Sequence, residues 1–344
     1  MTERIVHKGL ARVVSALWRS CPCDGCNFVA MKVLLLAVPS LLLFASCNVA
    51  RMHERSCTKR LERNEYASYT FNDARGAHHV WARETGKEKI LLLHGYTGSG
   101  AQQWSKTAKL LSDSFDVIMP DLLCHGKSTK DWGHAPGGNI DAQVAHVAMI
   151  LDSLHINGPL PVVGSSYGGG VAARFAEVHP ERVAKLVIYD GLVSDYSSAM
   201  ADSIARSVGG ESMLAVMGTP AAKDLRYGIR LALYRNPPLP GFILKQVYTT
   251  NVKPFRPAQV TLIKDLMENE TIFATKEYAW SMPVYLIWGE RDELIPNATG
   301  LAIMQRNGIP ADHWVTIPRT GHVANLERPK AFDQALRKIL AERP

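Results

Sequence analysis

Residues 161–168 read Pro161-Val-Val-Gly164-Ser-Ser166-Tyr-Gly168, a short apolar run that leads into a G-x-S-x-G pattern. The run predicts a buried strand, the glycines predict a tight turn, and residues 167–179 have a helical pattern. A serine between a strand and a helix is held clear of the sheet, and the positive end of the helix points towards it. This stretch therefore predicts an α/β fold in which Ser166 is a candidate nucleophile.

Apolar runs and helical patterns alternate on both sides of this junction. Short runs predict strands at residues 89–94, 116–120, 161–164, 185–189, 284–288 and 314–317, and a leading hairpin at 66–71 and 78–82. Helical patterns lie at residues 101–111, 141–155, 167–179, 298–306 and 329–341. Continuously apolar strands separated by helices are typical of a parallel sheet that is covered on both faces. We therefore expect a doubly wound, mostly parallel sheet.

The alternation is interrupted once, over residues 192–278, where helical patterns occur without a convincing strand. We interpret this stretch as a helical cap inserted into a core of residues 65–191 and 279–344. Residues 48–64 are polar and basic, and we interpret them as a linker.

The amino-terminal part has the pattern of an export signal. Met31-Lys32 precedes an apolar run that ends in Phe44-Ala45-Ser46-Cys47, and the run is short for a bilayer-spanning helix. The last four residues resemble a bacterial lipobox, which predicts lipidation of Cys47; an uncleaved anchor is the alternative. Either interpretation tethers an exported domain to a membrane. Since the signal pattern starts at residue 31, we interpret residues 1–30 as an upstream extension.

Composition excludes several classes of protein. Hydrophobic residues make up 47% of the 344 residues and charged residues 21%, as in ordinary globular proteins. The net charge is +7, but residues 1–63 carry ten basic and four acidic residues, so only about +1 remains for the rest. A nucleic-acid-binding domain would carry its basic charge on the folded part, so no nucleic-acid partner is expected. Cys21, Cys23 and Cys26 lack a fourth ligand at zinc-site spacing, so no metal is expected there.

A serine nucleophile needs a base, and the base needs an acid that orients it. Asp292 and His322 each follow a predicted strand, in Gly289-Glu-Arg-Asp292 and in Gly321-His322. Open α/β sheets place their ligands at the carboxyl ends of the strands. The order of serine, acid and histidine along the chain is the one used on such sheets.

Four motifs in this order, His94-Gly95, Gly164–Gly168, Gly289–Asp292 and Gly321-His322, make residues 66–342 similar to the α/β-hydrolase family with a cap. The resemblance implies that Ser166 is the nucleophile, Asp292 the acid and His322 the base. It also implies an oxyanion hole formed by the backbone N–H groups of Tyr167 and Tyr96, with no metal or cofactor.

Other polar residues in the motifs have simpler interpretations. Asp190 also follows a strand and is a rival for the acid, although the motif around Asp292 favours the latter. The His94-Gly95 pair is expected to shape the oxyanion loop, and Asp121 and His125 are expected to be structural. The methionines and aromatic residues of the cap could either line an acyl pocket or pack between helices: Met200, Met213, Met217, Tyr227, Tyr234 and Phe242.

The resemblance implies hydrolysis through an acyl-enzyme on Ser166, and we expect a carboxylic ester, such as a monoacyl lipid, as the small-molecule substrate. A carbon–carbon hydrolase of ring-fission products is the first alternative. Ser165 and Val323 depart from that group's pattern, which has Asn and an aromatic residue at these positions. A non-catalytic binding protein of the same fold is the second alternative. The oligomeric state is left open.

Overall fold

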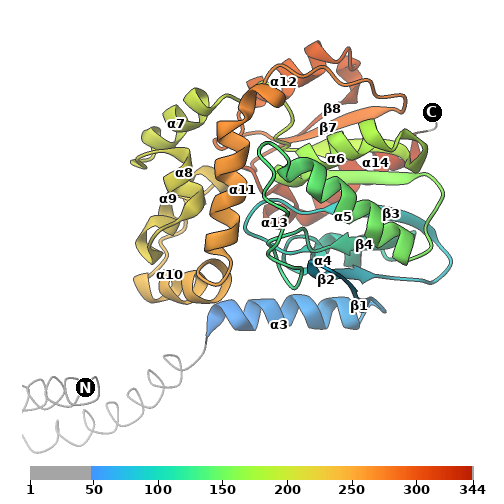
Figure 1. The fold of residues 1–344 in the computed structure, drawn as a ribbon, viewed down its shortest axis with the longest axis horizontal. Helices are drawn as coiled ribbons and strands as arrows, with labels where there is room; N and C mark the ends of the chain where they lie inside the picture. Colours follow the sequence, from blue (N-terminus) through green and yellow to red (C-terminus); the bar gives the residue numbers. More distant parts are fainter. Residues whose placement is uncertain (1–47, 343–344) are drawn as a thin grey trace, which may run out of the picture. The chain divides into compact units, whose positions relative to one another are not determined.

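The sheet has eight strands in the order β1-β2-β4-β3-β5-β6-β7-β8 (Figure 1). Its strands are β1 (Ala67–Asp73), β2 (Gly76–Ala82), β3 (Glu88–Leu93), β4 (Phe115–Pro120), β5 (Leu160–Ser165), β6 (Val183–Tyr189), β7 (Val284–Gly289) and β8 (Trp314–Ile317). The hairpin β1–β2 pairs antiparallel with β4, and the strands from β4 to β8 are parallel. The predicted doubly wound, mostly parallel sheet is confirmed.

The computed structural model describes residues 48–342. The predicted extension at 1–30, the signal or anchor at 31–47, the Cys21–Cys26 motif and Cys47 therefore lie outside the described residues. Among the helices of the described part, none combines the length and the apolar character needed to cross a bilayer.

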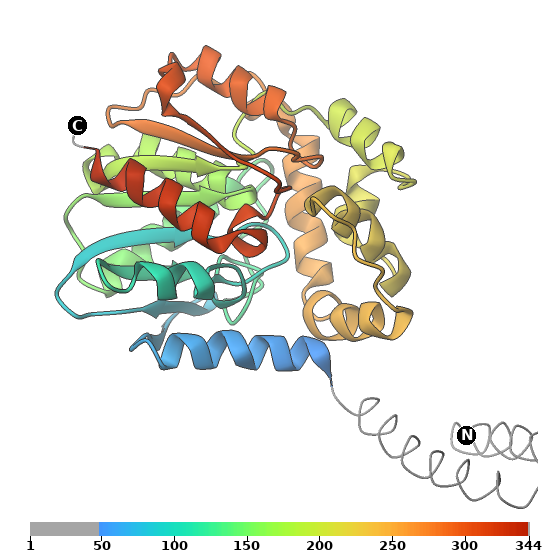
Figure 2. The same ribbon diagram turned by 180° about the vertical axis from the view of Figure 1, so that it is seen from behind.

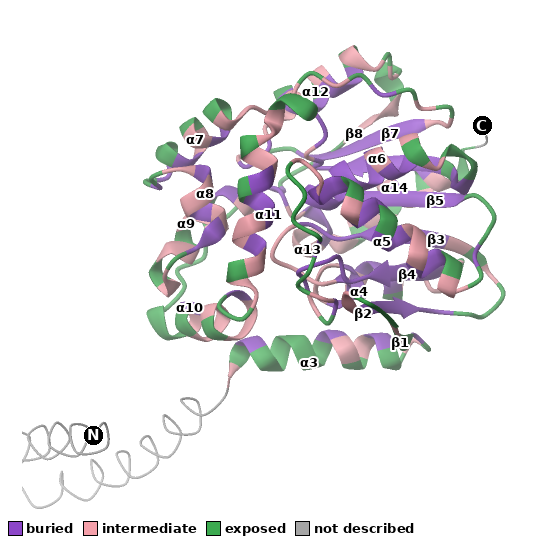
Figure 3. Ribbon diagram, in the orientation of Figure 1, coloured by how far each residue is buried: buried purple, intermediate pink, exposed green. Residues whose placement is uncertain are grey.

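Helices cover both faces of the sheet, and successive residues of a strand point alternately towards one face and the other. Leu91 and Leu93 belong to the core beneath α5 (Asn139–Ser153), α6 (Tyr167–Val178) and α12 (Asn297–Arg306). Ile90 and Leu92 belong to the core beneath α4 (Gly100–Leu111) and α14 (Pro329–Ala341). The inner parallel strands β3 to β7 are therefore buried on both sides, as Figure 3 shows, which explains their apolar runs.

Residues 49–62 correct the sequence interpretation, because they form helix α3 (Val49–Glu62) instead of a linker. Cys57 and Leu61, one turn apart, are buried in the core of the α4 face, and α3 packs on α4. Arg60 donates a 2.9 Å hydrogen bond to Ser105 of α4. The apolar side of this helix is narrow, so its sequence is dominated by exposed charges.

The cap is inserted between β6 and β7 and is entirely helical. Its helices are α7 (Ser198–Ser207), α8 (Met213–Gly218), η2 (Ala222–Asp224), α9 (Leu225–Ala232), α10 (Gly241–Val247), η3 (Tyr248–Val252), α11 (Arg256–Glu268) and η4 (Glu270–Ile272). Figures 1 and 2 show α7 to α11 gathered at one end of the sheet. The remaining short helices of the core are η1 (Pro180–Arg182), η5 (Ala311–His313) and α13 (Ala324–Glu327).

Candidate active site

Ser166 lies at a sharp turn between β5 and α6. Its φ of 53° and ψ of −122° are unusual for a residue with a side chain. The turn is held on both sides: the Ser166 N–H donates to the Tyr189 carbonyl at 3.0 Å, and the Ser166 carbonyl accepts from the N–H groups of Gly169 (2.8 Å) and Leu192 (2.9 Å). Hydrogen bonds to β6 and to the segment after it therefore hold Ser166 in this strained backbone conformation. Ser166 stays partly exposed at the start of α6.

The glycines of the motif are required by close backbone approach. A Cβ atom at Gly164 would overlap the Gly168 carbonyl, and one at Gly168 would overlap the His94 carbonyl. A Cβ at Gly95 would lie 3.0 Å from the Cβ of Ser166. The His94-Gly95 loop therefore packs directly against the serine.

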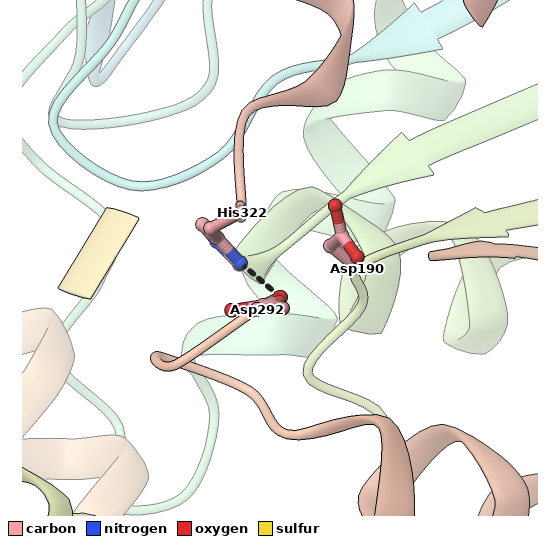
Figure 4. A group of neighbouring side chains, drawn as sticks. All are labelled: Asp190, Asp292 and His322. Atoms are coloured by element: carbon pink, nitrogen blue, oxygen red, sulfur yellow. Dashed lines mark hydrogen bonds and ion pairs between the residues drawn. The ribbon is translucent and has the colours of Figure 1, made fainter. Parts of the chain in front are cut away.

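Asp292 and His322 follow β7 and β8, and their side chains meet (Figure 4). His322 Nδ1 lies 2.7 Å from Asp292 Oδ2. Asp292 Oδ1 also accepts hydrogen bonds of 2.9 Å from the backbone N–H groups of Leu294 and Ile295. Because a carboxylate can only accept here, Nδ1 of His322 carries the proton and Nε2 is left as the basic nitrogen.

The three residues predicted from the sequence follow strands β5, β7 and β8. In the sheet, β6 lies between β5 and β7, and β8 lies next to β7. Among the described hydrogen bonds, none joins the Ser166 hydroxyl to His322. Such bonds are often long in enzymes without substrate and tighten when substrate is bound. The structure therefore brings Asp292 and His322 together directly, and places Ser166 at the same edge of the sheet.

Asp190, the rival acid, follows β6 and lies beside this pair. Carboxyl oxygens of Asp190 and Asp292 and a ring nitrogen of His322 all lie within 4.8 Å of one another. Asp190 Oδ1 accepts a 2.8 Å hydrogen bond from the Gly289 N–H. His322 is bonded to Asp292 and not to Asp190, so the geometry agrees with the choice made from the motif.

The two residues expected to supply the oxyanion N–H groups, Tyr96 and Tyr167, line the same pocket as Ser166. Tyr167 is the first residue of α6, and the N–H groups in the first turn of a helix have no partner within the helix. Tyr96 follows the His94-Gly95 loop and lines the same pocket as Ser166. These positions are the ones that an oxyanion hole on this fold requires.

His94, Asp121 and His125 are fully or almost fully buried and hold loops in place. His94 donates from Nδ1 to the Gly95 carbonyl at 2.7 Å and accepts at Nε2 from the Leu122 N–H at 2.9 Å, so both ring nitrogens are occupied. Burial lowers the pKa of His94 and lowers that of His125 to about 3. Asp121 accepts from His79 and from two backbone N–H groups. The polar atoms of His94 and Asp121 are therefore engaged in hydrogen bonds that shape these loops.

Gln103 is a site residue that the sequence did not reveal. Its Nε2 donates to Ser165 Oγ at 2.7 Å, and its Oε1 accepts from the Gly95 N–H at 2.7 Å. One amide therefore links the turn at Ser166 to the loop after His94. The side-chain amide of Asn325 in turn donates a 2.9 Å hydrogen bond to the backbone carbonyl of Gln103.

Glu327 plays a similar part at the histidine loop. Its carboxylate accepts from the Gly321 N–H at 2.7 Å and from the Tyr234 N–H at 3.0 Å. It therefore ties the loop that carries His322 to the cap. No sequence pattern pointed to this link, because Tyr234 lies far from Glu327 along the chain.

An apolar pocket of about 940 Å³, including its open mouth, begins at Ser166. It extends between the core and the cap and is lined mainly by Ile140, Leu192, Met213, Met217, Ile263 and Phe273. Among its described lining residues, Glu270 is the only one with a charged side chain. Of the cap residues considered from sequence, Met213 and Met217 line the pocket, and the other four are not among its described lining residues.

Comparison with known proteins places these features in a family. The family model described as alpha/beta hydrolase fold matches residues 89–329. The chain is 28% identical over 280 residues, 75% of this chain and 88% of the other, to a 2-hydroxy-6-oxononadienedioate/2-hydroxy-6-oxononatrienedioate hydrolase of Paraburkholderia phymatum. It is 39% identical over 110 residues, 32% of this chain and 40% of the other, to lipase LipV of Mycobacterium tuberculosis.

A solved structure of a membrane phospholipase A, described as a bacterial virulence factor, has the same fold. It superposes with a TM-score of 0.69 at 21% identity and covers 91% of this chain and 97% of that one. The match of the family model, the sheet order and the strand–turn–helix at Ser166 agree with one another. The chain belongs to the alpha/beta hydrolase fold family.

Proposed function

We propose that this protein is a serine hydrolase that cleaves a carboxylic ester with an apolar acyl group. Ser166 is the nucleophile, His322 the general base and Asp292 the acid that orients it. The observation that carries the proposal is the apolar pocket that begins at Ser166, beside the His322–Asp292 hydrogen bond. An activated serine at the mouth of an apolar pocket suits acyl transfer.

The reaction has two steps. His322 Nε2 takes the proton from the Ser166 hydroxyl as the oxygen attacks the ester carbonyl, and Asp292 stabilises the imidazolium that forms. The N–H groups of Tyr167 and Tyr96 bind the negative oxygen of the tetrahedral intermediate. The imidazolium then protonates the leaving alcohol, and water hydrolyses the acyl-enzyme with His322 as base again.

The charge of the pocket favours an ester over a ring-fission product. The Paraburkholderia relative is named for a dioate, which carries two carboxylates. Among the described residues that line the pocket here, no side chain is a cation. The hydrogen bond from Ser198 lowers the pKa of Glu270, so this residue is negative at neutral pH. An anionic substrate would therefore be repelled, whereas an uncharged acyl chain would bury apolar surface.

Carbon–carbon hydrolysis remains the second candidate, because several relatives that cover most of the chain are named for it. A panel of p-nitrophenyl esters of graded acyl length, beside a dienoic ring-fission product, separates the two. The proposal expects hydrolysis of the esters, with none of the dienoate and none by Ser166→Ala. Turnover of the dienoate at a higher kcat/KM than any ester would contradict it.

We also propose that the domain works at a membrane surface, tethered by its amino-terminal segment through lipid on Cys47 or an apolar anchor. The exposed side of α3 carries Met52, Arg55 and Lys59, spaced by three or four residues, and Arg63 follows the end of the helix. The hollow that they border also includes Lys109, and its described lining has no acidic residue. Such a surface suits anionic lipid.

Two experiments test this location. Residues 48–344 should sediment with phosphatidylglycerol vesicles and not with phosphatidylcholine vesicles, and Arg55→Gln/Lys59→Gln should reduce binding more than Lys330→Gln/Lys338→Gln on α14. Equal loss in both double variants would contradict the role of α3. Radiolabelled fatty acid should enter the full chain and not Cys47→Ala; equal incorporation would exclude lipidation of Cys47.

A further inference from the structure

A second carboxyl group, Asp190, is buried directly beside the Asp292–His322 pair (Figure 4). The side chain is fully buried. Its Oδ1 accepts from the Gly289 N–H, but its Oδ2 has no hydrogen-bond partner among the described residues when both carboxyl groups are treated as acceptors. An unsatisfied buried carboxyl oxygen is costly, so its protonation state needs an explanation.

The neighbours of Asp190 decide which of the two acids carries the charge. Asp292 accepts three hydrogen bonds, from His322 and from the Leu294 and Ile295 N–H groups, whereas Asp190 accepts one. Two carboxylates in one buried site cannot both ionise easily, and the group with more donors keeps the charge. Burial, and then the negative charge of Asp292, raises the pKa of Asp190 well above its usual range.

The other groups around Asp190 do not supply a compensating positive charge. Glu327 adds a further negative charge nearby, and Tyr189 is a buried phenol whose own pKa is raised by burial. His322 is the one basic group in the cluster, and its Nδ1 proton is directed at Asp292. The backbone φ of 44° at Asp190 is unusual for a non-glycine residue and holds the carboxyl in this place.

We propose that Asp190 is a positioning residue, held as a neutral carboxylic acid whose hydroxyl donates to Asp292, so that the two acids share one negative charge behind His322. The proposal rests on the proposed function, because it assigns Asp190 a role in orienting the base. It also explains the unsatisfied oxygen, which becomes a donor once it is protonated.

The arrangement makes Asp190 a reserve acid. If Asp292 loses its charge, the repulsion that keeps Asp190 protonated disappears, and Asp190 can ionise within reach of His322. Asp292→Asn should then keep part of its activity, and this residual activity should rise with pH as Asp190 loses its proton. No such rise is expected when both acids are replaced.

The test compares Asp292→Asn, Asp190→Asn and the double variant by kcat/KM for an ester across pH, with thermal unfolding of each. We expect a loss of roughly 10² for Asp292→Asn, roughly 10⁴ for the double variant, and less than tenfold for Asp190→Asn. Equal activity of Asp292→Asn and the double variant at every pH would overturn the proposal. A loss for Asp190→Asn as large as that for Asp292→Asn would also overturn it.

A measurement on the wild-type protein covers the case in which a variant does not fold. Carbon-13 NMR of protein labelled at the aspartate carboxyl carbon should show one aspartate that is still protonated at neutral pH. If every aspartate is ionised there, the proposal is wrong. This readout does not depend on catalysis, so a wild-type protein that hydrolyses no ester would contradict the proposed function alone.

Discussion

The side-chain amide of Gln103 donates a 2.7 Å hydrogen bond to the hydroxyl of Ser165, the residue before Ser166. The same amide accepts from the Gly95 N–H. The loop after His94 and the turn at Ser166 are thus held at a fixed separation by one side chain. Under the proposed function, this separation sets the distance between the Tyr96 and Tyr167 N–H groups that would bind the oxyanion.

Gln103→Leu should therefore lower kcat by about 10–10², because a displaced oxyanion donor weakens binding of the transition state. KM should change little, since the acyl pocket is untouched. Steady-state kinetics on one ester tests this, with the neighbouring Gln102→Leu as the matched control. A loss confined to KM, or an equal loss in the control, would contradict the positioning role.

The apolar pocket at Ser166 can be shortened from the cap. Ala201 on α7 is buried and lines the pocket, whereas Ser203 on the same helix is exposed. Ala201→Leu should lower kcat/KM for p-nitrophenyl laurate relative to p-nitrophenyl butyrate by about tenfold, because a few methylenes decide the fit of an apolar pocket. Ser203→Leu should leave the ratio unchanged. An unchanged ratio in Ala201→Leu would place the acyl chain elsewhere.

Helix α3 is expected to contribute to stability as part of the folded domain. Leu61 is fully buried, so Leu61→Ala should lower the free energy of unfolding by about 2–5 kcal/mol. Met52 on the same helix is 55% exposed, so Met52→Ala should change the free energy of unfolding by less than about 0.5 kcal/mol. Urea unfolding measures both. Equal, negligible effects would mean that residues 49–62 behave as the linker expected from sequence.

Asp190 should also give stability a specific dependence on pH. Its pKa is raised in the folded state, so the folded protein keeps a proton that the unfolded chain releases above its own pKa of about 3.9. Below about pH 3.9 the raised pKa of Asp190 makes its full contribution to the free energy of unfolding. As pH rises from there towards the folded-state pKa, this contribution is lost, by up to about 1.4 kcal/mol per pH unit. Asp190→Asn should remove this slope. Parallel stability curves for wild type and Asp190→Asn between pH 4 and 7 would contradict the assignment.

The fold followed from local patterns in the sequence. The strand–turn–helix around Ser166 and the apolar runs of the parallel strands are short-range signals, and the glycines were required by contacts within the motif itself. The predicted sheet and cap were confirmed for this reason. Helix α3 was missed, because only a narrow stripe that includes Cys57 and Leu61 is buried and the rest of its sequence is that of an exposed segment.

The candidate site was predicted in part. Asp292 and His322 follow strands in recognisable motifs, and the structure joins them. Gln103 and Glu327 gave no signal, since each acts on a backbone N–H group of a loop whose position depends on the whole sheet. The relation of Asp190 to Asp292 likewise depends on two strands being neighbours, which spacing along the chain does not show.

The central claim is that Ser166 is an activated nucleophile, and a fluorophosphonate probe tests it most directly. Intact-protein and peptide mass spectrometry of the wild-type chain should show one probe adduct, on Ser166. The rate of labelling should fall strongly in His322→Ala, and Ser166→Ala should not be labelled. A wild-type protein that stays unlabelled, or a Ser166→Ala variant that still labels and hydrolyses esters, would contradict the account.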